Sequence, residues 1–241
     1  MAASNFAESL NAIIEARHML KHPFYQLWAQ GRLSKETLKQ YAIQYARHVE
    51  AFPTYVSAVH ANTPDLEVRQ ALLENLVEEE RGPDNHPELW LRFIEGLGGS
   101  RAEVTTRPAL PATAQLVETF RALTREGSYL EGLTALYAYE AQIPAVATTK
   151  MEGLRKFYGI DDPRALAFFE VHRTADIDHA ITELTILRRH ATTPDDQEAV
   201  LAAARQSTDA LWSFLDGVMS AYVAPTEASP CEGKRLSAQA H

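Results

Sequence analysis

The chain has 241 residues, which is enough for one large domain or two small ones with a substantial core. Hydrophobic residues make up 46% of the chain and the formal net charge is −9, so a globular composition is combined with an acidity that argues against nucleic acid or an anionic membrane as the main partner. No apolar run approaches the roughly 20 residues of a membrane span, and the chain does not begin with a basic segment and an apolar core, so we expect neither a membrane anchor nor secretion.

Almost all of the chain from residue 4 to about 223 is predicted to be helical, because apolar side chains recur at helical spacing between proline and glycine breaks. In the first half we expect helices at residues 4–20, from Pro23 to Gly31, at 34–62 with a kink at Pro53, at 64–81 and at 86–96. A loop or broken helix is expected at residues 104–112. In the second half we expect helices at residues 113–125, at 130–158 with a kink near Pro144, at 163–189 and at 194–223.

The pattern predicts a single all-α domain over residues 1–223. The chain has no strand alternation bounded by turns, no repeat of 20–50 residues and no linker-like stretch. Residues 224–241 are polar and small, and we expect them to be disordered. The one cysteine, Cys231, falls in this tail. The chain therefore has no internal disulfide framework, which fits a reducing cytoplasm, and no cysteine nucleophile in its core.

One predicted helix carries two imidazoles and a carboxylate on the same side. His172, Asp176 and His179 stand at positions i, i+4 and i+7, and a helix turns about 100° per residue, so these side chains fall within roughly 60° of one another. The helix also carries enough apolar surface to be mostly buried, and buried ionisable groups are costly unless they are paired or bind a metal. The triad therefore predicts a transition-metal site. Taken singly, a core histidine bonded to a carbonyl and a surface aspartate are the plainer interpretations.

Two other segments offer further ligands. Glu140 lies in the apolar stretch LTALYAYEAQIPA, where we expect its carboxylate to be buried with a metal ion or with a buried arginine or lysine. The stretch LVEEERGPDNHPELW offers His86 and the consecutive residues Glu78, Glu79 and Glu80, which alternatively form a solvated helix end. Periodicity does not choose among the three glutamates. Carboxylates and imidazoles in this number suit a dinuclear iron or manganese site, which takes about six protein ligands.

Together these segments resemble the haem-oxygenase-like dimetal oxidases, and in particular the CADD-like proteins of bacterial 4-aminobenzoate biosynthesis. The resemblance extends from HPFYQLW at residue 22 to the helix that ends near Val223, and its ligand pattern is a glutamate, a histidine seven residues later, a distant glutamate and H-x3-D-x2-H. It implies a single-domain haem-oxygenase-like bundle of about seven main helices that holds two metal ions, Fe/Fe or Mn/Fe. The ligands implied by the family spacing are Glu79, His86, Glu140, His172, Asp176 and His179.

The CADD-like branch adds three residues to this set. A tyrosine in the HPFY segment corresponds to Tyr25, a tyrosine beside the central glutamate to Tyr139, and a lysine ten residues beyond that glutamate to Lys150. Proteins of this branch consume their own side chains. The resemblance therefore implies that Tyr25 supplies the ring of 4-aminobenzoate, that Lys150 supplies its amino nitrogen, and that Tyr139 relays oxidising equivalents from the metals. Without the resemblance, the two tyrosines are interpreted as packing residues and Lys150 as an exposed helix residue.

The resemblance also bears on co-substrates and assembly. Dioxygen and an unidentified reductant are the implied co-substrates, and a homodimer is the implied assembly. Two rival interpretations stay open: a dimetal oxidase that acts on an external small molecule, and a metal-free protein similar to the PQQ synthases. The TenA-like thiaminases of the same superfamily need a core cysteine nucleophile, and this chain has none.

Overall fold

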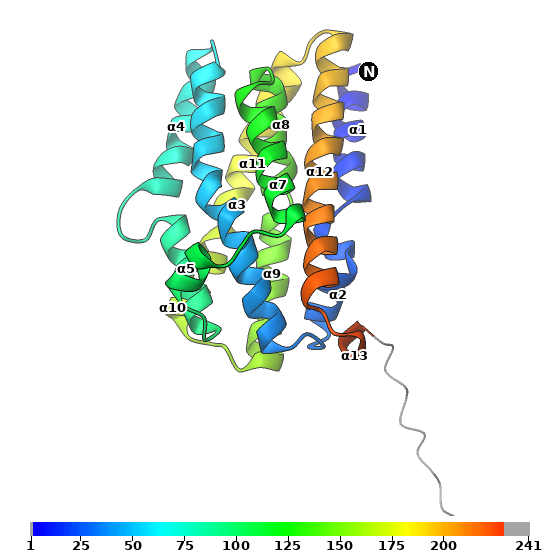
Figure 1. Cartoon of the computed structure of the whole chain (residues 1–241). Helices are drawn as coiled ribbons and strands as arrows, with labels where there is room; N and C mark the ends of the chain where they lie inside the picture. Colours follow the sequence, from blue (N-terminus) through cyan, green and yellow to red (C-terminus); the bar gives the residue numbers. More distant parts are fainter. Residues whose placement is uncertain (1, 229–241) are drawn as a thin grey trace, which may run out of the picture.

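The computed structural model describes residues 2–228, and this part of the chain is all-helical, without strands (Figure 1). The helices are α1 (Ala2–Ala16), α2 (Pro23–Ala29), α3 (Lys35–Asn62), α4 (Leu66–Glu80), α5 (His86–Gly96), α6 (Arg101–Thr106), α7 (Pro111–Arg125), α8 (Tyr129–Glu140), α9 (Ile143–Gly153), α10 (Pro163–His172), α11 (Ala175–His190), α12 (Pro194–Tyr222) and α13 (Pro225–Ala228). A short 3₁₀ helix, Met19–Lys21, and a π-helix, Leu154–Tyr158, complete them. The all-α prediction is confirmed.

Local sequence signals set several helix boundaries. The side chains of Ser100, Ser128 and Thr193 each accept the backbone N–H three residues on, in a capping box with the acidic residue at that position. Gly31 follows α2 with φ of +66°, a left-handed conformation that glycine adopts without strain. A Cβ atom at Gly31 would also collide with the ring of Phe157.

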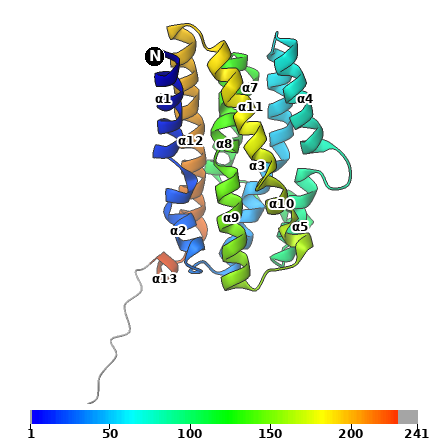
Figure 2. The same ribbon diagram turned by 180° about the vertical axis from the view of Figure 1, so that it is seen from behind.

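The long helices lie side by side (Figures 1 and 2). Aromatic side chains are buried between them. Helix α3 packs against α4, α5, α7 and α8, and α12 packs against α1, α7 and α8. On the face shown in Figure 2, α11 packs on α8, and α10 packs on α5. The connection between α4 and α5 projects from the side of the bundle in both views. Four buried tyrosines of the interior come from α2, α3 and α8: Tyr25, Tyr41, Tyr45 and Tyr139.

Two helices that the sequence analysis treats as continuous are broken, and both breaks fall at candidate ligands. The run 130–158 divides after Glu140, because Pro144 has no N–H to donate to the Glu140 carbonyl group. The run 163–189 divides after His172, where the Thr174 N–H donates to the Val171 carbonyl group in a tighter turn. The bundle is therefore divided into more helices than the seven or so that were expected. The prediction that one helix carries His172, Asp176 and His179 is wrong, because His172 ends α10 while Asp176 and His179 lie on α11.

The boundary between the helical domain and the tail, expected at residue 223, agrees only in part with the structure. Residues Pro225–Ala228 form helix α13, and the Glu227 carboxylate accepts hydrogen bonds from the backbone N–H of Ser34 and the Thr37 hydroxyl group. These contacts attach the start of the expected tail to the beginning of α3. The remainder of that tail, with Cys231, lies outside the described residues. Among the described helices, none combines the length and the apolar character needed to cross a membrane.

Candidate metal centre

Glu79, His86 and His172 form the first of two groups of metal-binding side chains, which we call site 1. One ligand atom of each lies within 4.8 Å of the others, and all three side chains are buried. Glu79 is in the last turn of α4 and His86 is the first residue of α5, so the projecting connection between these helices turns the two side chains toward each other. Gly82 has φ of +81° in this connection. His86 Nδ1 lies 2.9 Å from Glu79 Oε1.

The orientation of His172 leaves one ring nitrogen free for a metal ion. Its Nδ1 donates to the Phe168 carbonyl oxygen at 2.7 Å, and because a carbonyl only accepts, the neutral ring carries its lone pair on Nε2. The ring stacks on Phe168, with 3.9 Å between centroids, and lies 4.2 Å from the His86 ring. Burial, followed by the charge of His86, holds the pKa of His172 well below its usual value. Site 1 therefore offers a carboxylate and two imidazoles, which suit iron or manganese.

Glu140, Asp176 and His179 form the second group, site 2. One ligand atom of each again lies within 4.8 Å of the others. Glu140 ends α8, and Asp176 and His179 lie in the first turns of α11. His179 Nδ1 is 3.4 Å from Glu140 Oε1 and 3.8 Å from Asp176 Oδ1. Burial, with the charges of Glu140 and Glu79, raises the pKa of Asp176 well above its usual value.

Two residues outside the expected set hold site 2 in place. Asn75 on α4 is buried, and its amide donates to Glu140 Oε1 at 3.0 Å. Glu78, half-exposed on the same helix, lies 3.3 Å from His179 Nε2. A histidine that ligates a metal through one nitrogen usually donates the other N–H to a carboxylate or carbonyl group, and Glu78 takes that position here. Of the three glutamates that periodicity did not separate, Glu79 is buried in site 1, Glu78 orients His179, and Glu80 is exposed.

The donor atoms at these sites fit metal ions. Glu140 Oε2 and Asp176 Oδ2 are buried and have no hydrogen-bond partner in the part of the chain that the structure describes. No lysine or arginine pairs with either carboxylate among these residues, so the alternative of a buried arginine or lysine partner for Glu140 is not supported; the basic side chain beside Glu140 is that of His179, 3.4 Å from Oε1. Buried carboxylate oxygens without donors are costly, and a cation that coordinates them removes that cost.

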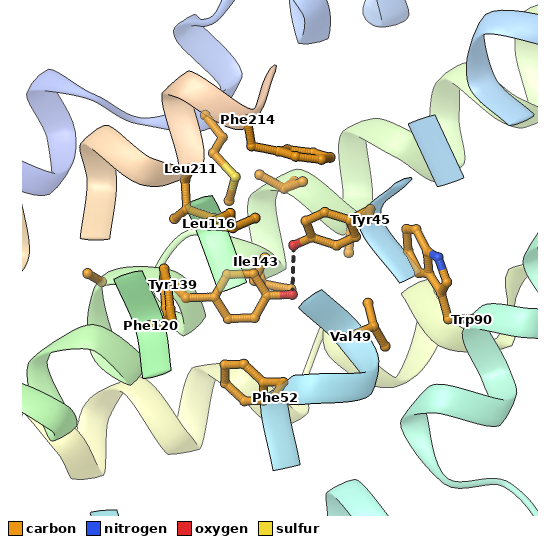
Figure 3. Packing of buried hydrophobic residues seen from close by; sticks show 14 of the residues in the cluster. Tyr45, Val49, Phe52, Trp90, Leu116, Phe120, Tyr139, Ile143, Leu211 and Phe214 are labelled. Carbon is orange, nitrogen blue, oxygen red and sulfur yellow. Dashed lines mark hydrogen bonds between the residues drawn. The ribbon is translucent and has the colours of Figure 1, made fainter. Parts of the chain in front are cut away.

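A chain of tyrosines extends from the metal centre into the core. Tyr139 lines a cavity of about 10 Å³ together with all three side chains of site 1. Its hydroxyl group accepts a 2.9 Å hydrogen bond from that of Tyr45, and Figure 3 shows the two hydroxyl groups facing each other among apolar side chains. Tyr45 stacks on Tyr41, with 5.5 Å between centroids and 18° between planes. The Tyr41 hydroxyl group is hydrogen-bonded to that of Tyr25 at 2.9 Å.

Lys150 lies at the far end of this chain. Its side chain is 3% exposed, and Nζ donates to the Tyr41 hydroxyl group at 2.8 Å. Six aromatic rings lie within 5.1 to 5.9 Å of Nζ: Tyr25, Trp28, Tyr41, Tyr45, Trp90 and Phe169. No carboxylate pairs with it among the described side chains, and burial lowers its pKa to about 7. The interpretation of Lys150 as an exposed helix residue is therefore wrong.

The structure brings every residue of the expected set to this region, but with a different connectivity. The six candidate ligands divide into sites 1 and 2, with His172 separated from Asp176 and His179. Tyr25 reaches Tyr139 only through Tyr41 and Tyr45, which the sequence analysis did not single out. Asn75 and Glu183 were also missed. Glu183 follows His179 by four residues, so the helical spacing used for the triad extends to it.

This helical bundle with two adjoining groups of carboxylates and histidines defines a class of metal-dependent redox proteins. The family model described as iron-containing redox enzyme matches residues 39–212. The chain belongs to this haem-oxygenase-like family of iron-containing redox enzymes.

Named relatives are similar over almost the whole chain. A 4-aminobenzoate synthase of Nitrosomonas europaea is 47% identical over 93% of this chain and 95% of its own length. A 4-aminobenzoate synthase of Chlamydia muridarum is 42% identical over 89% of this chain and 90% of its own. Among solved structures, a CADD-like protein of unknown function from Nostoc punctiforme superposes with a TM-score of 0.76 at 20% identity, over 93% of this chain and 100% of that one, which shows the shared fold.

Proposed function

We propose that this protein makes 4-aminobenzoate from its own tyrosine ring and the amino group of Lys150, using dioxygen and a reductant at a dinuclear centre of two irons or of manganese and iron. The observation that carries the proposal is the continuous path from Tyr139, beside site 1, through Tyr45 and Tyr41 to Lys150. Similarity to proteins named 4-aminobenzoate synthase supports the same product.

The proposed product sets what the residues must do. In 4-aminobenzoate the amino group is para to the carboxyl group, as the hydroxyl group of tyrosine is para to Cβ. The amine of Lys150 must therefore replace a phenol oxygen, and Cβ of that tyrosine must become the carboxyl carbon. The exchange of oxygen for nitrogen releases water and does not change the oxidation level of that ring carbon. Cleavage of the Cα–Cβ bond with conversion of Cβ into a carboxyl carbon is oxidative, and so is release of the nitrogen from Cε of Lys150. Metal ions bound at sites 1 and 2 would supply the oxidising equivalents from dioxygen.

The tyrosines are suited to carry those equivalents inward. Burial raises the pKa of Tyr41, Tyr45 and Tyr139 well above the usual value, so each phenol keeps its proton at neutral pH. Removal of an electron from such a phenol then requires loss of its proton. The hydrogen bond from Tyr45 to Tyr139, and that between Tyr41 and Tyr25, give these protons short routes.

Lys150 is suited to act as the amine donor. An ammonium group has no lone pair to attack a ring, whereas a neutral amine does. The lowered pKa of Lys150, about 7, leaves a large fraction of the side chain neutral near neutral pH. Its hydrogen bond to the Tyr41 hydroxyl group fixes the position of Nζ, which lies 5.4 Å from the centroid of the Tyr25 ring.

Two tyrosines compete for the role of the consumed ring. Tyr25 is the ring implied by the CADD-like resemblance, and its centroid lies 5.4 Å from Lys150 Nζ. Tyr41 is the ring whose hydroxyl group receives the Lys150 hydrogen bond. We propose Tyr25 as the consumed ring and Tyr41 as the residue that positions the amine. The contact with Lys150 makes Tyr41 the alternative.

Peptide mapping after one aerobic turnover with iron, manganese and reductant tests the proposal. Trypsin separates the two rings, because Tyr25 lies in peptide 22–32 and Tyr41 in peptide 40–47. Loss of a tyrosine side chain from peptide 22–32 supports Tyr25. Peptide 40–47 also contains Tyr45, so a loss there supports Tyr41 when fragmentation of the peptide assigns it to residue 41. Loss of the Lys150 amine abolishes cleavage there and fuses residues 126–155 into one peptide. Product formation with both tyrosine peptides and the cleavage after Lys150 intact contradicts self-consumption.

A second candidate function is the oxidation of an external small molecule. A cavity of about 350 Å³ adjoins site 2, between α4, α8 and α11, and is lined in part by Asn75, His179 and Glu183. Its volume is within the range of small-molecule sites. Unchanged product formation by Tyr25→Phe, Tyr41→Phe and Lys150→Met variants would favour this function over self-consumption.

A further inference from the structure

Glu183 on α11 is a buried carboxylate that the six implied ligands leave unexplained. Its side chain is 4% exposed, and neither oxygen has a hydrogen-bond partner among the described residues. The charge of Glu140 acts on it and, less strongly, that of Asp176. A carboxylate held without donors beside two others is costly unless a cation neutralises it.

We propose that Glu183 is a fourth protein ligand of the metal ion at site 2, together with Glu140, Asp176 and His179. The proposal rests on the proposed function only in requiring a metal ion at site 2. Asp176, His179 and Glu183 stand at positions i, i+3 and i+7 of α11, so their side chains project from the same side of one unbroken helix.

Charge balance supports the assignment. Without Glu183, sites 1 and 2 together contain three carboxylates, those of Glu79, Glu140 and Asp176. Two divalent ions carry a total charge of +4, so three carboxylates leave a buried net positive charge. With Glu183 ionised, the four carboxylates and two ions form a neutral cluster, which is the less costly state in a buried site.

The surroundings of Glu183 also fit a ligand. The side chain lines the 350 Å³ cavity between α4, α8 and α11, and it shares that cavity with Asn75 and His179. Glu183 therefore lies where the cavity meets site 2.

Anaerobic iron(II) titration of the full chain, read by chelator competition and metal analysis, tests the proposal. Wild type is expected to bind two ions. In Glu183→Gln, which keeps the shape of the side chain, we expect one ion to bind as in wild type and the other at least tenfold more weakly. Glu74→Gln is the matched control, because it removes one exposed carboxylate from the same cavity and should leave both affinities within twofold of wild type.

Thermal unfolding distinguishes a ligand from a purely structural residue. Without metal, Glu183→Gln should unfold at a higher temperature than wild type, because an unpaired buried carboxylate is gone. With metal it should unfold at a lower one. If Glu183 is purely structural, Glu183→Gln should unfold at a lower temperature than wild type both without and with metal, and that result overturns the proposal.

Glu183→Asp serves as a second variant, which keeps the charge but withdraws the carboxylate by one methylene and should weaken the same ion less. Wild-type affinity for both ions in both variants overturns the proposal and leaves the dinuclear centre intact. Fewer than two ions in wild type overturns the dinuclear centre, and no bound ion at all overturns the role of Glu183 as well.

Discussion

The hydroxyl groups of Tyr45 and Tyr139 share a 2.9 Å hydrogen bond that joins the edge of the metal centre to the aromatic interior (Figure 3). Tyr139 comes from α8 and Tyr45 from α3, 94 residues apart in the chain. Since Tyr45 also stacks on Tyr41, this contact is the junction between site 1 and the aromatic rings around Lys150.

The Tyr45→Phe variant should interrupt this junction while preserving the packing. It removes one hydroxyl group and keeps the ring, so we expect product formation to fall at least tenfold with unchanged metal content. The matched control is Tyr55→Phe, also on α3, whose hydroxyl group donates to the Val117 carbonyl oxygen at 3.4 Å away from the path. A Tyr45→Phe protein that forms product at the wild-type rate would show that oxidising equivalents do not pass through the Tyr45 hydroxyl group.

The pH dependence of the reaction should follow Lys150. With a pKa of about 7, the neutral amine increases as pH rises through 7, so single-turnover product formation should rise across this range and level off above it. Measurement of the initial rate between pH 6 and 9 checks this expectation, with metal loading held constant. A rate that falls over the same interval would contradict an amine nucleophile.

The same burial makes Lys150 destabilising at neutral pH. The unfolded chain keeps the Lys150 proton up to about pH 10.5, whereas the folded chain loses it near pH 7, so the free energy of unfolding should rise with pH between these values. Lys150→Met should remove this dependence and stabilise the protein at pH 7 by about 4 kcal/mol. Denaturant unfolding at several pH values measures both effects. Lys35→Met, at an exposed position on α3, should leave the pH profile of unfolding as it is in wild type.

Asn75 should affect metal binding although it is not an expected ligand. Asn75→Ala removes the 3.0 Å hydrogen bond that orients Glu140, and loss of such a supporting contact typically weakens metal affinity about 10- to 100-fold. Iron(II) titration measures the change. Asn62→Ala is the control, because Asn62 donates to the Thr124 and Arg125 carbonyl oxygens. Equal metal affinity in both variants would mean that Glu140 needs no support from Asn75.

Metal ions should stabilise the fold. An ion present at 100 times its dissociation constant adds about 2.7 kcal/mol per site to the free energy of unfolding, and a chelator should reverse this. Asp176→Ala should keep the contribution of site 1 and lose most of that of site 2. Calorimetry with and without iron(II) under anaerobic conditions measures the shift. If Asp176→Ala responds to metal as strongly as wild type does, Asp176 is not a ligand.

Local signals were sufficient for most of the fold. Apolar periodicity, capping residues and proline positions predicted the helical class and most helix boundaries, because these signals act within a few residues. They failed at the turns after Glu140 and His172. A proline near residue 144 predicted a kink rather than a full break, and nothing at Thr174 marked the end of a helix.

The sequence by itself determined the all-α class and the residue types that metal binding needs, because periodicity and side-chain chemistry are local properties. The resemblance to the CADD-like proteins then implied which of these residues are metal ligands and which tyrosines and lysine react. Only the tertiary structure decided that His172 joins Glu79 and His86 while Asp176 joins Glu140, that Glu183 is buried beside them, and that Lys150 contacts Tyr41. These relationships depend on backbone breaks and on the packing of helices far apart in the chain, which no spacing along one helix contains.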